Sequence, residues 1–121
     1  MIAGAHVLLF SADADADRNF VRDVLKFSSV DAGRGWLIFA LPPSELAIHP
    51  LDGEETGRAD AGLKAALYLM CTDVHALITA MAERHVDCAP VVEERWGLRT
   101  AIRLPSGGQL GVYQPTHPTA I

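Results

Sequence analysis

The chain of 121 residues has few of the features that mark membrane, secreted or metal-stabilised proteins. It has only two cysteines, Cys71 and Cys88, and their spacing of 17 positions fits no compact zinc pattern. Both lie in apolar segments, so we expect reduced core thiols and a cytoplasmic location. The longest apolar runs, HVLLF and AALYLMC, are far shorter than a membrane span. We also expect no signal peptide and no membrane partner.

Positive charge is scarce as well. Ten Lys and Arg residues stand against 15 Asp and Glu residues, which gives a formal net charge of −5 and a pI of about 5.4. This balance would repel the phosphates of nucleic acid, so we expect no nucleic acid partner. An acidic chain is compatible with a cationic ligand, but ordinary solubility explains the same balance equally well.

Several motifs that carry chemistry are absent. The sequence offers no Ser-His-Asp or Cys-His arrangement, and the stretch SGG at 106–108 lacks the strand–loop–helix context of a phosphate site. Asp13, Asp15 and Asp17 resemble the start of a calcium loop, but no Gly follows at the sixth position and no Glu at the twelfth. We therefore expect these carboxylates at the start of a helix, where they cap free backbone N–H groups.

The sequence does contain an internal repeat. Residues 5–50 and 65–115 each read as an apolar strand, an Asp, an amphipathic helix and three further strands. Asp13 and Asp73 follow the first strand of each copy, 60 positions apart. Because two copies are too few for a solenoid, we expect two βαβββ modules in a single domain. Residues 51–62 are polar and rich in glycine, and we expect them to link the modules.

Hydrophobic periodicity gives the expected elements. In the first copy, a helix begins at Asp13 and the strands lie near 5–10, 28–31, 35–41 and 45–49. In the second copy, Asp73 caps a helix and the strands lie near 65–71, 90–95, 98–104 and 109–114. The apolar stripes of the two helices are Phe20, Val21, Val24 and Leu25 in the first, and Val74, Leu77, Ile78 and Met81 in the second.

This layout resembles the vicinal-oxygen-chelate superfamily, which includes glyoxalases, bleomycin-resistance proteins and extradiol dioxygenases. The matching stretches are HVLLFSADADADRNFVRDVLKF, LYLMCTDVHALITAMAERHV and LPSGGQLGVYQP, of which the last is similar to the family's closing hairpin. The resemblance covers nearly the whole chain. It implies an α+β fold whose two βαβββ modules form one cupped, half-open mixed sheet around a ligand cavity, commonly in a homodimer that covers the open sheet edges.

The resemblance also implies four positions for metal ligands, on the first and last strand of each module. His6 matches the first of these positions. Ala66 and Gly111 stand at two others and carry no ligand atom. The fourth position falls at Ala47, or at His49 in a register two residues later. The family's full metal site is therefore incomplete in this sequence.

Two functions stay open on this basis. We favour a small-molecule-binding protein of the glyoxalase/bleomycin-resistance type with no cofactor, in which small residues at the ligand positions leave a hollow. The expected ligand contacts are His6, His49, Trp96, Tyr113 and Arg99. Each has a packing alternative, and for Arg99 this is an ion pair with Glu93 or Glu94 across a hairpin.

The alternative is a metal-dependent lyase, isomerase or dioxygenase with a shifted site. A stable catalytic metal site usually has three protein ligands. His6 and His49 would supply two, and Glu45, which shares a strand face with His49, would supply the third. A divalent metal thus remains possible in this reading.

Overall fold

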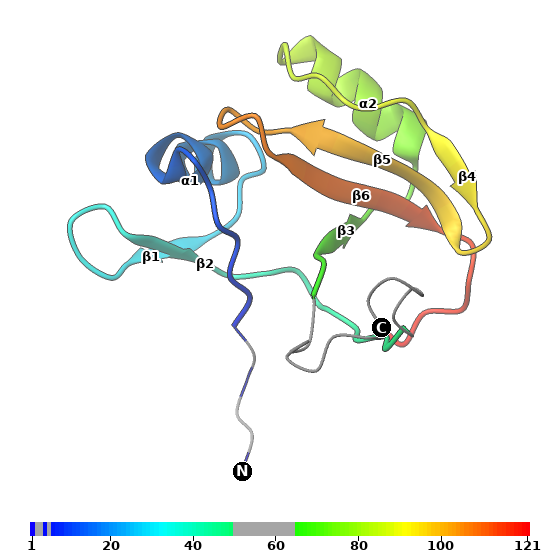
Figure 1. The fold of residues 1–121 in the computed structure, drawn as a ribbon, viewed down its shortest axis with the longest axis horizontal. Coiled ribbons are helices and arrows are strands. Elements are labelled where there is room, and N and C mark those ends of the chain that lie inside the picture. Colours follow the sequence, from blue (N-terminus) through cyan, green and yellow to red (C-terminus); the bar gives the residue numbers. More distant parts are fainter. Residues whose placement is uncertain (2–3, 5, 50–64) are drawn as a thin grey trace, which may run out of the picture.

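A computed structural model describes residues 1, 4, 6–49 and 65–121 (Figure 1). The first module contains α1 (Ala14–Asp23), β1 (Ser29–Asp31) and β2 (Leu37–Phe39). The second contains β3 (Tyr68–Met70), α2 (Val74–Glu83), β4 (Val92–Glu94), β5 (Gly97–Arg103) and β6 (Gln109–Pro115). The expected linker at 51–62 lies outside the described residues. Among the residues described, no helix has the length and apolar character needed to span a membrane.

The second module forms a four-stranded mixed sheet in the order β3-β6-β5-β4. β3 runs parallel to β6, with Tyr68 opposite Gly111, and the other neighbours are antiparallel. Helix α2 covers one face of this sheet (Figure 1). The strands expected near 65–71, 90–95, 98–104 and 109–114 are all present, with β3 and β4 shorter than the sequence predicted.

The core lies where both helices meet this sheet. It consists of Phe20 from α1, Met81 from α2, and Ile102, Leu110 and Val112 from β5 and β6. The predicted apolar stripes are confirmed, because Val74 is fully buried and the remaining stripe residues are buried or half-buried. Phe20 thus attaches the first module to the core of the second.

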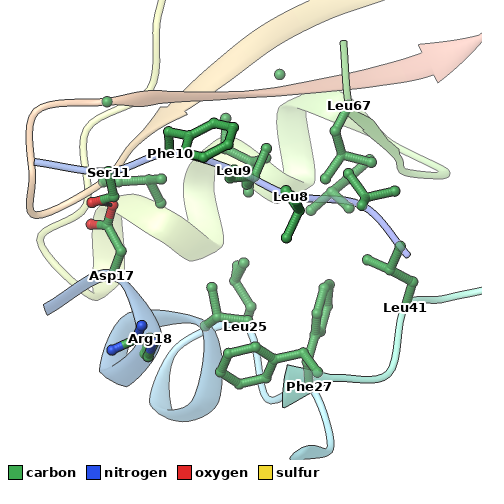
Figure 2. A pocket seen from close by; sticks show the side chains of 18 of the residues that line it. Leu8, Leu9, Phe10, Ser11, Asp17, Arg18, Leu25, Phe27, Leu41 and Leu67 are labelled. Carbon is green, nitrogen blue, oxygen red and sulfur yellow. Dashed lines mark hydrogen bonds between the residues drawn. The ribbon is translucent and has the colours of Figure 1, made fainter. Parts of the chain in front are cut away.

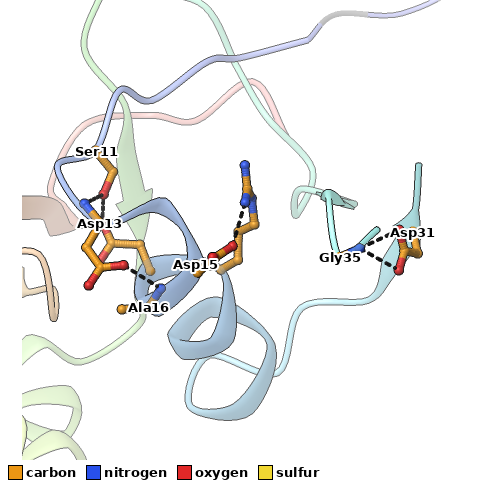
Figure 3. Close-up of polar contacts among 8 residues, drawn as sticks. Ser11, Asp13, Asp15, Ala16, Asp31 and Gly35 are labelled. Atoms are coloured by element: carbon orange, nitrogen blue, oxygen red, sulfur yellow. Dashed lines mark hydrogen bonds and ion pairs between the residues drawn. The ribbon is translucent and has the colours of Figure 1, made fainter. Parts of the chain in front are cut away.

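Aspartates begin both helices, as predicted. The Asp13 carboxylate accepts a hydrogen bond from the amide of Ala16 at 3.1 Å (Figure 3). The Asp73 carboxylate accepts from the amides of His75 and Ala76, both at 3.0 Å. Each aspartate satisfies amides that have no partner within the helix, which fixes where the helix starts.

The first module has less regular structure than its repeat predicts. β1 and β2 pair only with each other, as a two-stranded antiparallel sheet apart from the larger one (Figure 1). The Asp31 carboxylate closes their turn by accepting hydrogen bonds from the amides of Gly33 and Gly35, of which Figure 3 shows the one from Gly35. The prediction of strands at 5–10 and 45–49 is wrong for the described residues 6–10 and 45–49, which belong to no strand.

A missing partner strand explains this difference. An extended segment becomes a strand only where its backbone N–H and C=O groups meet those of a neighbour. β3 has β6 beside it, whereas no described strand lies along residues 6–10 or 45–49. The apolar side chains of these two segments are accordingly exposed, with Phe10 at 95% and Ile48 at 90% of their full accessible area.

The close approach of β5 to β6 at Gly97 provides a test of the sheet. A methyl group at Gly97 would overlap the carbonyl oxygen of Gln114, which is backbone and cannot rotate away. We expect Gly97→Ala to lower the free energy of unfolding by about 1–3 kcal/mol, the usual cost of overpacking. Urea denaturation measures this change.

Gly4→Ala is the matched control for Gly97→Ala, because a methyl group there would meet no atom within 4 Å. We expect the control to change the free energy by less than about 0.5 kcal/mol. Equal stabilities of the two variants would contradict the described contact between β5 and β6.

Candidate functional site

An open cavity of about 880 Å³ is lined by residues of both modules (Figure 2). The first module contributes residues 6–11, α1 and the β2 region, and the second contributes β3, β5 and β6. Most of the wall is apolar, and it includes Leu8, Phe10, Leu25, Phe27, Phe39, Leu41, Leu67, Leu69 and Leu110. The exposed apolar segment at 6–10 therefore forms one wall of the cavity.

The most deeply buried ionisable group of this wall is Asp17, which is 9% exposed. Its Oδ2 accepts hydrogen bonds from the hydroxyls of Ser11 at 2.6 Å and Ser106 at 2.7 Å. Its Oδ1 accepts from the backbone amide of Ser106 at 3.1 Å. Ser106 lies in the turn between β5 and β6, so this carboxylate connects α1 of the first module to the hairpin of the second.

The environment of Asp17 keeps it ionised. Burial raises the pKa of its carboxyl group, but the three hydrogen bonds from Ser11 and Ser106 together outweigh burial and lower the pKa below its ordinary 3.8. Its place in the first turn of α1 acts in the same direction, because the helix dipole favours negative charge there. The cavity wall therefore carries a fixed negative charge at neutral pH.

Two arginines also line the cavity, and each has a carboxylate of its own. Arg18 Nη1 lies 3.0 Å from Asp15 Oδ1, and its guanidinium stacks over the ring of Trp36 at 4.3 Å. Arg99 Nε lies 2.9 Å from Glu94 Oε1. The ion pair that the sequence offered as the alternative role of Arg99 is thus present, and the residue lines the cavity as well.

Small residues shape the floor of the cavity. Ala66, Ala101 and Gly111 all line it, and Ala101 lies opposite Gly111 across β5 and β6. The space that the missing side chain of Gly111 leaves is partly filled, because a methyl group there would lie 2.6 Å from the ring of Tyr68. Ala66 and Gly111, which stand at two of the four positions expected for metal ligands, are thus small residues. Gly111 leaves room for the ring of Tyr68, and both residues line the cavity.

Of the other four residues predicted to contact the ligand, only one lines the cavity. His6 lines the cavity, but Trp96, Tyr113 and His49 are not among the lining residues. Trp96 and Tyr113 pack edge to face with each other and with Tyr68, at ring-centroid distances of 5.0 to 6.0 Å. This cluster covers the end of the sheet beside the cavity, and His49 is exposed.

Tyr113 and Glu45 are brought together through the C-terminal tail. The Nδ1 of His117 lies 2.7 Å from the carbonyl oxygen of Pro118, which can only accept, so Nδ1 carries the proton. The other ring nitrogen, Nε2, is hydrogen-bonded to the Tyr113 hydroxyl at 3.0 Å. Burial, followed by the charge of Glu45, raises the pKa of Tyr113 above its ordinary 10.0, so the phenol remains a donor at neutral pH.

The three residues expected as metal ligands, His6, His49 and Glu45, are not grouped together among the described residues. Glu45 accepts from the amide of Ala120 at 2.7 Å and lies 3.9 Å from His117 Nε2, so its carboxylate is engaged at the tail. Within the described part of the chain, no three His, Cys, Asp or Glu side chains are grouped to hold an ion. His6, His49 and Glu45 are accordingly not assembled into one site in a single chain.

Sequence reasoning missed the roles of Ser11, Asp17 and Ser106. Asp17 belongs to a run of acidic residues at a helix start, a position that is usually solvated. The only signal that distinguishes it is helical spacing, since Asp17 lies three positions before Phe20 and shares its face of α1. Its partner Ser106 is 89 positions away, and no local pattern connects the two.

Comparison with known proteins gives matches in structure alone. No model of a protein family matches the sequence, and no curated protein matches it either. A lactoylglutathione lyase from Agrobacterium tumefaciens superposes with a TM-score of 0.64 over 93% of this chain and 92% of its own, at 18% identity.

Two proteins from Streptomyces sp. CB03234 also share the fold. TnmS3, an antibiotic binding protein, matches with a TM-score of 0.61 over 96% of this chain and 100% of its own, at 23% identity. A glyoxalase/bleomycin resistance protein matches with a TM-score of 0.55 over 86% and 93%, at 20% identity. These matches confirm the predicted α+β, glyoxalase-like fold.

The buried carboxylate generates a prediction about pH. Because the folded state holds the pKa of Asp17 below 3.8, its contribution to stability is present above that pH and is lost as the pH falls through the folded pKa. We expect Asp17→Asn to lower the free energy of unfolding by about 1–3 kcal/mol at pH 7, with a smaller difference from wild type at pH 3. Urea denaturation at both pH values measures this.

Asp15→Asn is the control, because the Asp15 side chain is 90% exposed and its ion pair is solvated. We expect Asp15→Asn to change the free energy of unfolding by less than about 1 kcal/mol at pH 7. A difference between wild type and Asp17→Asn that stays constant from pH 7 to pH 3 would show that Asp17 does not titrate as described.

Proposed function

We propose that this chain, which has a glyoxalase-like fold, is a small-molecule-binding protein that holds an apolar or aromatic ligand between its two modules. The cavity is the observation that carries this proposal. Its volume of about 880 Å³ falls within the range of roughly 300–1,000 Å³ that small-molecule sites occupy. Its walls are largely apolar with a few polar groups, which is the usual composition of such sites.

The polar groups of the wall fit binding better than they fit a reaction. Asp17, Arg18 and Arg99 are each held by hydrogen bonds or an ion pair. Fixed polar groups orient a ligand at low entropic cost. We propose that His6 and Arg99 contact the ligand at the polar parts of the wall, and that binding requires no metal ion.

The printed names of the structural neighbours support the same class of function. One neighbour is described as an antibiotic binding protein and another as a glyoxalase/bleomycin resistance protein. We propose that this chain likewise sequesters its ligand, and that it acts in the cytoplasm. Cys71 and Cys88 are free thiols, and burial raises the pKa of both, which keeps them in the unreactive protonated form.

Filling the cavity tests this function. Ala101 lines the floor and faces Gly111, so a larger side chain there would occupy the volume of a ligand. We expect Ala101→Phe to weaken binding of a neutral aromatic probe, naphthalene methanol, by about tenfold or more, because the probe and the phenyl ring would overlap. Isothermal titration calorimetry measures the affinity, and EDTA should leave the wild-type value unchanged.

Ala80→Phe is the matched control, because Ala80 is exposed on α2 and does not line the cavity. We expect this variant to bind the probe as the wild type does. Unchanged binding by a folded Ala101→Phe variant would show that the ligand does not occupy this cavity. An EDTA-sensitive affinity would show that a metal takes part.

We propose that the chain assembles as a homodimer. Leu46 and Ile48 are about nine-tenths exposed in a segment that belongs to no strand, and Val30 is also exposed on β1. Apolar side chains beside unpaired backbone favour association with another chain. A second copy that pairs with residues 45–49 would supply the partner strand that this segment lacks.

Sedimentation equilibrium tests the assembly. We expect wild type at micromolar concentration to have twice the 13.0 kDa mass of the chain. A double variant, Leu46→Glu with Ile48→Glu, should have the mass of one chain, because it places two charges in the contact. The control Thr79→Glu alters an exposed residue of α2 and should remain dimeric. Wild type at 13.0 kDa would refute the dimer.

A further inference from the structure

Asp17 has an unusual set of partners for a buried carboxylate. All three groups that donate to it are neutral, namely the hydroxyls of Ser11 and Ser106 and the amide of Ser106. No Lys, Arg or His nitrogen among the described residues lies within 4 Å of it. Buried charges are normally paired with a counter-ion. Asp17 is therefore an ionised group at the cavity wall without a counter-ion in the described part of the chain.

The arginines of the cavity do not take this role. Arg18 follows Asp17 directly in α1, but its guanidinium contacts Asp15 and the face of Trp36. Arg99 is paired with Glu94 of the adjacent strand. Each arginine in the wall thus has an acidic partner, and the carboxylate of Asp17 is the charge in the wall that remains unbalanced by the described residues.

The carboxylate also retains capacity for one further donor. An ionised carboxylate offers about four lone-pair positions. Oδ2 uses two of them for the serine hydroxyls, and Oδ1 uses one for the Ser106 amide. A position on Oδ1 therefore remains for a ligand. A cationic donor would bind there most strongly, because a charge-assisted hydrogen bond is about twice as strong as a neutral one. The apolar wall also reduces the screening of the two charges by water.

We infer that the ligand of this cavity carries a protonated amine that binds the Asp17 carboxylate, while its apolar body lies against the aromatic and aliphatic wall. This inference rests on the proposed function and specifies its ligand class. Phe10, Phe27 and Trp36 supply aromatic surface on the same cavity, and Ser11 and Ser106 hold the carboxylate in place. The site thus selects an amphiphilic cation over a neutral or anionic molecule of equal shape.

A matched set of probes tests the inference. Naphthalen-1-ylmethylamine, naphthalene methanol and 1-naphthoate share one aromatic body and differ in charge at neutral pH. We expect wild type to bind the amine about tenfold or more tightly than the alcohol, and the alcohol more tightly than the carboxylate. Isothermal titration calorimetry at low ionic strength measures the three affinities.

Variants separate the charge of Asp17 from its structural role. Asp17→Asn should bring the affinities for amine and alcohol to within about twofold of each other, while the alcohol itself still binds. Ser106→Ala removes one hydrogen bond to Asp17 but keeps the charge, so it should retain the preference for the amine. Glu83→Gln, an exposed change on α2 with the same change in net charge, should also retain it.

The possible results separate the inference of a cationic ligand from the proposed function of small-molecule binding. Equal binding of amine and alcohol by wild type would overturn the inference and leave the cavity as a binding site. A preference for the amine that persists in a folded Asp17→Asn variant would also overturn it, because another group would then recognise the cation. Failure of all three probes to bind wild type would instead count against the proposed function.

Discussion

The hydrogen bonds of the Asp17 carboxylate hold the two modules in the arrangement that creates the cavity. Phe20, one helical turn further along α1, enters the core of the second module, and Asp17 fixes the same helix to the hairpin between β5 and β6. A hydrophobic contact alone would permit rotation of α1, because it is not directional. Hydrogen bonds to both the backbone and the side chain of Ser106 add direction. The position of α1 against the sheet therefore rests on the packing of Phe20 together with the hydrogen bonds of Asp17.

The local features of the fold were predictable from the sequence. Asp13 and Asp73 are helix caps because a short acidic side chain before an apolar stripe satisfies the first free amides. The stripes at the spacing of a helix predicted which residues would face the core, from Phe20 to Met81. Alternation and the Pro-Gly turn predicted β5 and β6. Each of these signals comes from residues a few positions apart, and the structure confirms them.

Features that depend on distant partners were not predictable in this way. Residues 6–10 have the same apolar pattern as β3, but β3 lies beside β6 and residues 6–10 lie along no described strand. The two segments have similar apolar patterns, but only β3 has a neighbouring strand with which its backbone can form hydrogen bonds. Tyr113 is similar, since its hydroxyl partner His117 lies in a tail that shows no periodicity. In the site, the resemblance to the superfamily indicated His6, and Arg99 was offered either as a ligand contact or as an ion pair, while Asp17 was taken only for a helix-start residue.

The two modules differ in how their apolar and aromatic side chains are packed. In the second module, Gly111 admits the ring of Tyr68, which packs with Trp96 and Tyr113 and strengthens the end of the four-stranded sheet. The first module keeps its apolar residues exposed toward the cavity and beyond it. In the proposed function, the apolar wall would contact the body of the ligand and the charge of Asp17 would orient it.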